Sequence, residues 1–370
     1  MKEVFISVLF LSCLLTASGQ RQMTMPAFLK PGDSIAVISP CSTPEEKTVA
    51  DGCAILRQWG YVPVVGRHAL DEDHGFAGTA DDRASDLLWA LRDSTIRAIM
   101  CSRGGDGAVQ VLMRVPLSEY RRHPKWLIGF SDVTALHSAS VQAGVMSIHG
   151  SMCYAIAAQE GTDTVSVTLR RLLQGELPRY QLAPHSLNQY GTAEGMLVGG
   201  NFSVFCGLAG SDYDFLRQRD IILFIEDTDE EMTKVDRMLH LLEVRGILQR
   251  LKAVIVGHFT DYKRPKNDFD DMYHMLHHYL QHYPIPVVYG FPVGHARPNF
   301  PLIEGAQVRL TVTPEGTTMQ YKGRDPDGLT PDPSPTGEGR RLWRRGSPSP
   351  LSSWRGAGGE AVPPRLRRGG

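Results

Sequence analysis

The sequence has little net charge and no basic stripe in the region expected to fold, and these absences exclude one class of partner. Its 370 residues carry 39 Lys and Arg against 40 Asp and Glu, for a formal net charge of -1. Nucleic acid is therefore not an expected partner, because binding to phosphates needs clustered positive charge. A composition of 42% hydrophobic and 21% charged residues predicts a soluble globular protein with a core.

Cysteine pairs are also missing. None of the six cysteines lies in a Cys-x-x-Cys pair or at a Cys/His ligand spacing, which argues against structural zinc. Five cysteines follow the first twenty residues, an odd set without close pairs, so we expect no disulfide framework. They are Cys41, Cys53, Cys101, Cys153 and Cys206.

The first nineteen residues contain only a short hydrophobic run. Lys2 precedes an apolar stretch from Val4 to Leu15, and Ala17-Ser18-Gly19 offers a small-x-small cleavage site. The run is too short for a stable membrane-spanning helix. We therefore expect a signal peptide over residues 1–19, an exported and periplasmic mature chain, and no transmembrane segment in it. Cys13 leaves a lipoprotein as an alternative.

Residues 34 to about 150 alternate apolar strands with helical stretches, which is typical of βαβ units and a parallel sheet. We expect a first helix from Thr43, with Thr43 as N-cap and Glu46 completing a capping box, to near Gly60. A second helix is expected over residues 82–93. Strands are expected over residues 34–40, 61–66, 96–102 and 126–130.

A second unit is expected after a polar stretch at residues 174–193, which we interpret as a linker. Its predicted elements are strands over 220–227, 251–259 and 284–292, a helix over 234–244, and a hairpin around Pro314-Glu315-Gly316. Residues 323–370 consist mainly of Gly, Pro, Ser and Arg, so we expect a disordered low-complexity tail.

Ser131 is the first candidate for chemistry. Gly129-Phe130-Ser131-Asp132 lies where a strand gives way to a helix, the position of a nucleophile elbow. Helix capping is the alternative, because Ser and Asp are common at such junctions. Val133 stands where the second glycine of G-x-S-x-G would be, which weakens an ordinary α/β-hydrolase.

A glycine-rich loop, Arg103-Gly104-Gly105-Asp106-Gly107, follows the predicted third strand. Its backbone N–H groups could donate to an oxyanion. A phosphate-binding loop is disfavoured, since neither the P-loop ending nor the G-x-G-x-x-G fingerprint is present. A merely tight turn remains an alternative.

Glu226 and His295 are the other candidates. Glu226 ends a very apolar strand, where a charge is costly unless it is paired. Asp227, Glu230 and Glu231 are expected to form the solvated turn and first helical turn that follow. His295 lies in a loop directly after a strand, where a neutral imidazole could accept a hydroxyl proton.

The remaining histidines are expected to be packed or solvated. His274 and His278 have a spacing that could suit a metal on a helix, but no H-E-x-x-H glutamate accompanies them. We therefore expect neither a metal nor another cofactor.

Taken in order, eight segments resemble the LD-carboxypeptidase family. They are KPGDSIAVISP, FAGTADDRASDLLWAL, SRGGDGA, WLIGFSDVTALH, HGSM, GMLVGGNFSV, ILFIEDTDEEMTKVDRML and GFPVGHARPN. The resemblance covers about residues 26 to 322, and the ordered set is far more specific than any single segment.

The resemblance implies a role for each candidate. Ser131 matches the family's nucleophile, His295 its general base and Glu226 the carboxylate that holds that base. The matching oxyanion donors are the backbone N–H groups of Gly105 (or Gly104) and Asp132. The family's glycine motif usually reads GGYG, so Asp106 replaces a tyrosine here and puts any contact made by that ring in doubt.

The resemblance also implies a fold and a substrate. The expected fold is α/β, with an N-terminal flavodoxin-like parallel-sheet domain (26–173), a smaller C-terminal β-rich α/β domain (194–322), and the active site in the cleft between them. A homodimer is expected. The implied activity is serine-type hydrolysis of the L,D-amide bond that releases terminal D-alanine from murein tetrapeptide. A self-immunity peptidase acting on peptide-nucleotide antibiotics and a noncatalytic muropeptide-binding protein are the alternatives.

Overall fold

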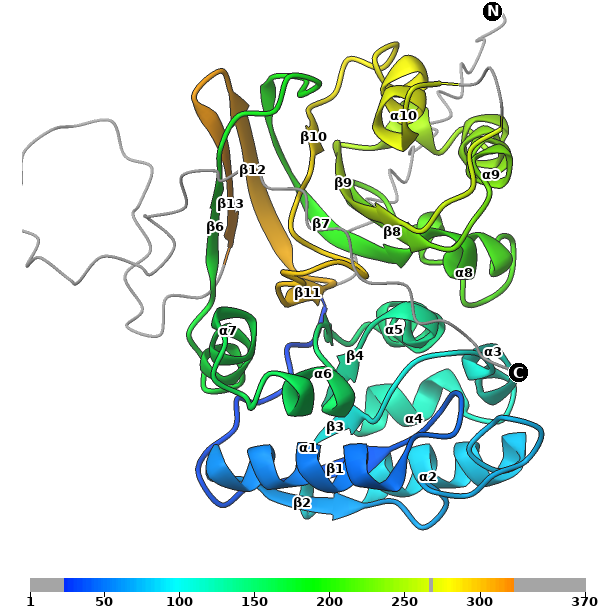
Figure 1. Ribbon diagram of the computed structural model, residues 1–370, viewed down its shortest axis with the longest axis vertical. Helices are drawn as coiled ribbons and strands as arrows, with labels where there is room; N and C mark the ends of the chain where they lie inside the picture. The colour runs from blue at the N-terminus through cyan, green and yellow to red at the C-terminus, as the bar shows by residue number, and fades with distance from the viewer. Residues whose placement is uncertain (1–22, 266–268, 323–370) are drawn as a thin grey trace, which may run out of the picture. The chain divides into compact units, whose positions relative to one another are not determined.

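The computed structural model describes residues 23–265 and 269–322. The predicted signal peptide and the predicted tail lie outside the described residues. Two sheets organise the described part of the chain, which belongs to one compact unit (Figure 1). Within these ranges, no helix has both the length and the apolar character needed to cross a bilayer. The five cysteines in these ranges are free and buried.

The first sheet has six strands in the described ranges, in the order β11-β5-β4-β3-β1-β2. Its neighbours pair in parallel except β11, which is antiparallel to β5. The order β2-β1-β3-β4-β5 is that of flavodoxin-like folds, which confirms the predicted fold class. The strands are β1 (Ser34–Ile38), β2 (Val62–Val65), β3 (Ile96–Cys101), β4 (Trp126–Gly129), β5 (Ser147–His149) and β11 (Leu302–Glu304).

Helices cover both faces of this sheet. Ile35 and Val37 of β1 pack in one apolar cluster with α1, α6 and α7, while Ala36 and Ile38 pack in another with α2, α3 and α5. This division follows from the alternation of side chains along a strand. The helices are α1 (Glu46–Gln58), α2 (Ala80–Arg92), α3 (Ala108–Leu112), α4 (Leu117–Arg122), α5 (Thr134–Ala143), α6 (Cys153–Ala158) and α7 (Thr164–Leu173).

The start of the first helix differs from the prediction. Glu45, not Thr43, is the N-cap of α1, and no side chain caps this end. Thr43 instead donates its backbone N–H to Gly75 O and its hydroxyl to Phe76 O. The predicted capping box is therefore wrong, because contacts with a distant turn hold Thr43 outside the helix.

The second sheet runs β10-β9-β8-β7-β12-β13-β6. Strands β7 to β10 are parallel, and β12, β13 and β6 are joined antiparallel. Helices α8, α9 and α10 share an apolar cluster with β7, β8 and β9. The elements are β6 (Arg179–Leu182), β7 (Gly191–Asn201), α8 (Phe202–Gly207), β8 (Ile221–Thr228), α9 (Met232–Val244), β9 (Ala253–Thr260), α10 (Met272–Leu280), β10 (Val287–Tyr289), β12 (Gln307–Thr313) and β13 (Gly316–Tyr321).

The chain crosses between the sheets in ways that the sequence interpretation did not include. The stretch 174–193 contains β6, which pairs with β13, as well as the start of β7. Later, β11 returns to the first sheet and pairs with β5. Both segments extend a sheet edge, where unpaired backbone groups accept another strand. The domain boundaries 26–173 and 194–322 stay a prediction.

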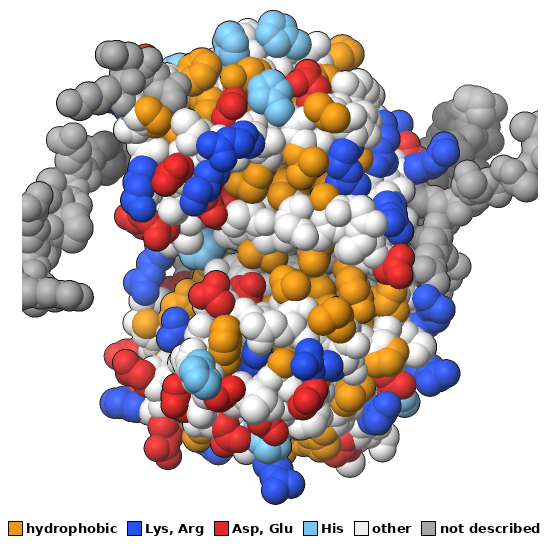
Figure 2. Space-filling model, turned by 90° about the vertical axis from the view of Figure 1, so that its right-hand side faces the viewer, with side chains coloured by type: hydrophobic (Ala, Val, Ile, Leu, Met, Phe, Trp, Pro, Cys, Tyr) orange, Lys and Arg blue, Asp and Glu red, His pale blue; other side chains and the backbone are white. Residues whose placement is uncertain are grey.

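Several large apolar side chains are exposed on the described surface. Val109 of α3 and Met113 directly after that helix are 47% and 80% exposed, and Val244 at the end of α9 is 86% exposed. Figure 2 shows hydrophobic side chains gathered across the middle of one face, with charged side chains mainly above and below them. A gathered apolar patch marks a contact surface more often than scattered residues do.

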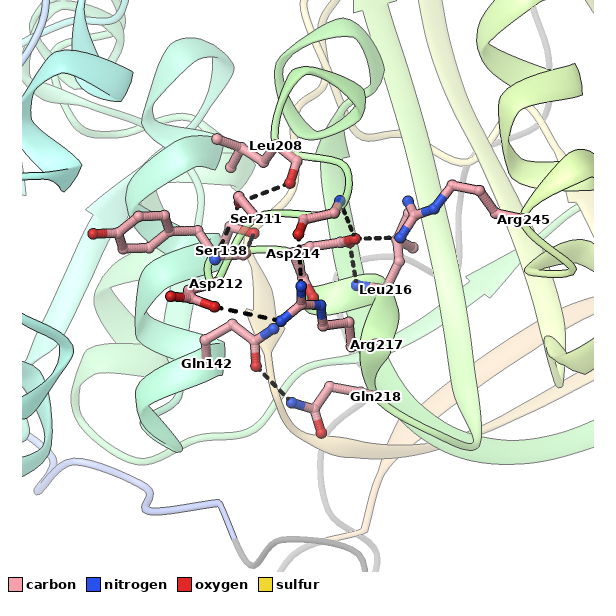
Figure 3. A network of polar contacts seen from close by, with 12 residues as sticks. Ser138, Gln142, Leu208, Ser211, Asp212, Asp214, Leu216, Arg217, Gln218 and Arg245 are labelled. Atoms are coloured by element: carbon pink, nitrogen blue, oxygen red, sulfur yellow. Dashed lines mark hydrogen bonds and ion pairs between the residues drawn. The ribbon is translucent and has the colours of Figure 1, made fainter.

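Helix α5 is held to the second half of the chain by a polar network (Figure 3). Ser138 donates to Tyr213 O at 2.5 Å, and Gln142 donates to Asp214 O at 2.5 Å. The Asp214 carboxylate in turn accepts from Gly210 N and Leu216 N and pairs with Arg245. Because buried polar groups are costly without partners, this network fixes the position of α5.

Candidate active site

Ser131 lies on a strained turn at the carboxyl end of β4. Phe130 is extended, Ser131 has a φ of 65°, and a short 3₁₀ turn (Ser131–Val133) leads into α5. A positive φ is uncommon for a residue with a Cβ and persists where the surroundings enforce it. No side chain caps this turn, and the Ser131 hydroxyl contacts His295 instead. The helix-capping alternative is therefore wrong.

The structure brings the three predicted side chains into one hydrogen-bonded chain. His295 Nε2 lies 2.9 Å from Ser131 Oγ, and His295 Nδ1 lies 2.6 Å from Glu226 Oε2. Glu226 is fully buried, and the His295 side chain is 17% exposed. A hydroxyl, an imidazole and a carboxylate in this order form the geometry of a hydrolase triad.

The surroundings of His295 set its proton affinity. Burial alone lowers the pKa of His295, but the hydrogen bond and the charge of Glu226 outweigh it, so the net pKa lies above its ordinary value of 6.5. Asp227 and Asp261 act in the same direction. An imidazole held this way gains stability when it takes up a proton, as a general base must.

Glu226 and Asp227 point in different directions from the end of β8. The pairing of β8 with β9 shifts register between Ile225 and Asp227, and successive side chains of a strand point to opposite faces. Asp227 thereby accepts from Asn201 Nδ2 at 2.8 Å and from Ser203 N at 2.9 Å.

Asp227 is only 2% exposed, so its predicted place in a solvated turn is wrong. The donors at the start of α8 allow the carboxylate to be buried there. Burial raises the pKa of Asp227 to about 6, and the charge of Glu226 adds to that shift.

The glycine loop approaches Ser131 closely. A Cβ at Gly104 would lie 3.2 Å from Ser131 Oγ, and one at Gly105, where φ is +113°, would lie 2.1 Å from Ser42 Oγ. A side chain at Gly105 would therefore be strained as well as blocked, and one at Gly104 would press on Ser131. Within the described residues, the N–H groups of Gly104 and Gly105 donate no hydrogen bond, which leaves them available to a ligand.

The Asp132 side chain ties the Ser131 turn to this loop, a role that the sequence interpretation did not include. Its Oδ2 accepts from Ala108 N, at the start of α3, at 2.8 Å. Burial raises the pKa of Asp132, although the bond from Ala108 N opposes the shift. Asp106, which replaces the family's tyrosine, is exposed and donates its backbone N–H to Ser42 Oγ at 3.1 Å.

A cavity of about 430 Å³ opens at this point. Its lining comes from segments that follow β1, β3, β4 and β5, together with His295, so it lies at the carboxyl ends of the parallel strands, where α/β folds bind ligands. The lining residues are Pro44, Glu45, Thr48, Arg103, Gly104, Gly105, Phe130, Ser131, Met152, Tyr154 and His295.

Metal-ligand side chains do not gather around this cavity in the described part of the chain. Among the described residues, the group that could hold an ion is His68, Asp71 and Asp82, none of which lines the cavity. These residues are already engaged, since His68 Nδ1 lies 2.7 Å from Asp71 Oδ2 and Asp82 closes the capping box of α2 with Thr79. His274 of the histidine cluster bonds Asp271 on its own helix.

Two family models match most of the described chain. Residues 35–150 match the LD-carboxypeptidase N-terminal domain and residues 194–310 match the LD-carboxypeptidase C-terminal domain. The chain belongs to the LD-carboxypeptidase family. The predicted family is thus confirmed, and the protein shares the fold of a family of peptidases.

Individual relatives are similar over most of the chain. "Probable murein peptide carboxypeptidase" of Bacillus subtilis is 32% identical, with 80% of this chain and 94% of the relative covered. "Murein tetrapeptide carboxypeptidase" of Pseudomonas aeruginosa is 29% identical, covering 72% and 89%. The muramoyltetrapeptide carboxypeptidase of Oxalobacter formigenes superposes with a TM-score of 0.71 at 24% identity, covering 78% and 98%. The Escherichia coli microcin C7 self-immunity protein MccF is 24% identical, covering 79% and 94%.

Proposed function

We propose that the protein is a serine-type LD-carboxypeptidase that releases terminal D-alanine from murein tetrapeptide. The observation that carries this proposal is the continuous hydrogen-bonded chain from Ser131 through His295 to the buried Glu226 beside an open cavity. The printed names of the Bacillus and Pseudomonas relatives support the choice of murein peptides.

The first half of the reaction forms an ester on the enzyme. His295 Nε2 takes the Ser131 proton while Oγ bonds to the carbonyl carbon of position three. The N–H groups of Gly105 and Asp132 are the proposed donors to the resulting oxyanion. Protonated His295 then gives its proton to the amide nitrogen, the C–N bond breaks, and D-alanine leaves with a free amine.

The second half regenerates the enzyme. Water gives a proton to His295 and attacks the ester carbonyl, and the Ser131 oxygen recovers that proton as the tripeptide carboxylate departs. Glu226 keeps its charge throughout, orients the imidazole through Nδ1 and stabilises the imidazolium.

A direct test offers the purified protein murein tetrapeptide in the presence of a chelator and follows D-alanine by mass spectrometry. We expect release of one D-alanine per peptide, undiminished by the chelator, and no release from the matched tetrapeptide that ends in L-alanine. Failure to cleave the D-terminated peptide would overturn the proposed substrate. Cleavage of an aminoacyl sulfamoyl nucleotide instead would favour the MccF-like alternative, and binding without cleavage would favour the binding-protein alternative.

We also propose that the protein is exported and forms a homodimer. The apolar run from Val4 to Leu15 and the Ala17-Ser18-Gly19 site support export, and the apolar patch of Figure 2 gives a second copy a surface to cover. Cell fractionation with N-terminal sequencing tests export, with a start near Gln20 expected in the periplasm. Light scattering tests the dimer, and the mass of a single chain at micromolar concentration would contradict it.

A further inference from the structure

Arg103 lies two residues beyond Cys101, the last residue of β3. Ser102 before it is fully buried and fixed, since its N–H donates to Ile38 O and its hydroxyl bonds Ser39 Oγ at 2.6 Å. The chain therefore leaves the sheet at a defined point, with Arg103 on the lining of the cavity.

The Arg103 guanidinium has almost nothing to bind within the protein. It makes one long contact, from Nη1 to Thr43 O at 3.4 Å, and no ion pair among the residues that the structure describes. Arg83, next to the same loop, is the opposite case. Its buried guanidinium donates to Gly78 O, Pro40 O, Gly107 O and Gln110 Oε1.

The two arginines differ in whether their donors are used within the protein. Arg83 uses its donors to hold the loop in place, whereas Arg103 presents a planar set of free donors to the cavity. A guanidinium of this kind suits the two oxygens of a carboxylate.

The free guanidinium starts close to the reacting atoms. A Cβ at Gly104, the next residue in the chain, would lie only 3.2 Å from Ser131 Oγ. In an amino acid leaving from a peptide C-terminus, the carboxylate carbon is two bonds from the scissile nitrogen, about 2.5 Å away. The carboxylate therefore lies close to Ser131, where the long side chain of Arg103 can reach it.

We infer that Arg103 binds the free α-carboxylate of the residue that Ser131 releases, and so makes the enzyme an exopeptidase. This inference rests on the proposed function. Glu45 lines the same cavity, so without Arg103 a carboxylate would meet a wall with negative charge. Arg103 therefore decides whether an anionic peptide end is accepted.

The test compares two substrates in four proteins. Murein tetrapeptide and its C-terminal amide are given to the wild type, Arg103→Gln, Arg103→Lys and the control Arg57→Gln, which removes a charge from the exposed last turn of α1. We expect the wild type to prefer the acid. In Arg103→Gln, KM for the acid rises between about 10-fold and 100-fold with little change for the amide, the range of a hydrogen bond to a charged group.

The intermediate variants sharpen the result. Arg103→Lys keeps the positive charge but cannot bind the carboxylate through two parallel hydrogen bonds, so it should retain part of the preference for the acid. The control Arg57→Gln should retain all of it. An unchanged preference for the acid in Arg103→Gln would overturn this inference and leave the proposed function intact. Loss of the preference in Arg297→Gln would do the same, because Arg297 is the other arginine whose charge acts on Tyr154. Failure of the wild type to cleave the acid overturns the proposed function, and this inference with it.

Discussion

The two halves of the candidate site are built in different ways. The half that follows the first sheet gives backbone geometry: a serine at positive φ and two glycines whose N–H groups are unpaired. The half that follows the second sheet gives charge, since Glu226 is fully buried and Asp227 nearly so. Both use the carboxyl ends of parallel strands, but the carboxylate that bonds the histidine comes from the second half.

A buried polar chain joins the two halves behind the reacting atoms. Asn201 N donates to Thr134 Oγ1 at 3.0 Å, three residues beyond Ser131, while Asn201 Nδ2 donates to Asp227, next to Glu226. Asn201 is 5% exposed. Because unpaired buried polar groups are costly, this chain and the Asp214 network fix the distance between serine and histidine.

Removing the serine should give the largest effect. In Ser131→Ala, kcat should fall by about 10⁴-fold or more, because the nucleophile is lost while the oxyanion donors and the cavity remain. Ser85→Ala, an exposed serine on α2, is the matched control and should keep full activity. If Ser131→Ala still releases D-alanine, and both variants keep the near-UV circular dichroism spectrum of the wild type, Ser131 is not the nucleophile.

Neutralising the carboxylate tests the charged half. Glu226→Gln should lower kcat by about 10³- to 10⁴-fold, because the imidazole loses its orienting charge. Activity requires neutral His295, so the rate rises with pH through the pKa of His295. Glu226 now holds that pKa above 6.5 against the effect of burial. In the variant burial is opposed only by the smaller effects of Asp227 and Asp261, so the acidic limb of the kcat/KM profile should move to lower pH. A limb that stays in place or moves upward would refute this account of the charge.

Cutting the tether within the first half should have a smaller effect. Asp132→Ala leaves Ala108 N without its acceptor, which should lower the free energy of unfolding by about 1–3 kcal/mol and kcat/KM by roughly 10- to 100-fold through misplacement of the glycine loop. Asp132→Asn keeps an acceptor oxygen and should lose less in both measurements. Equal losses in the two variants, measured by urea unfolding and steady-state rates, would show that the tether is not the cause.

The first half was the easier to predict from sequence. Its strands lie in consecutive βαβ units, and Ser131 and the glycine loop follow β4 and β3 within a few residues. Local pattern was therefore enough for β1 to β4 and for both candidate segments, but it did not predict β5 or β11. It failed at Thr43, where bonds to Gly75 and Phe76 overrode a plausible capping box.

The second half depends on long-range pairing that a local pattern does not contain. The burial of Asp227 requires a register shift against β9 and donors from Asn201 and Ser203, and β11 pairs with a strand more than 150 residues earlier. Glu226 and His295 could be singled out because Glu226 lies near the end of an apolar strand, His295 follows one, and the family resemblance matched both. The contribution of Arg103 to the cavity needed the comparison with the saturated Arg83.

The claim that serine and histidine act as one unit across the two halves is tested most directly by a double-mutant comparison. The kcat values for D-alanine release by Ser131→Ala, His295→Ala and the variant with both changes would be measured under identical conditions. If the two side chains form a single proton-transfer pair, the double variant should be no slower than the slower single variant. Losses that multiply would mean that Ser131 and His295 act independently, and would contradict the account.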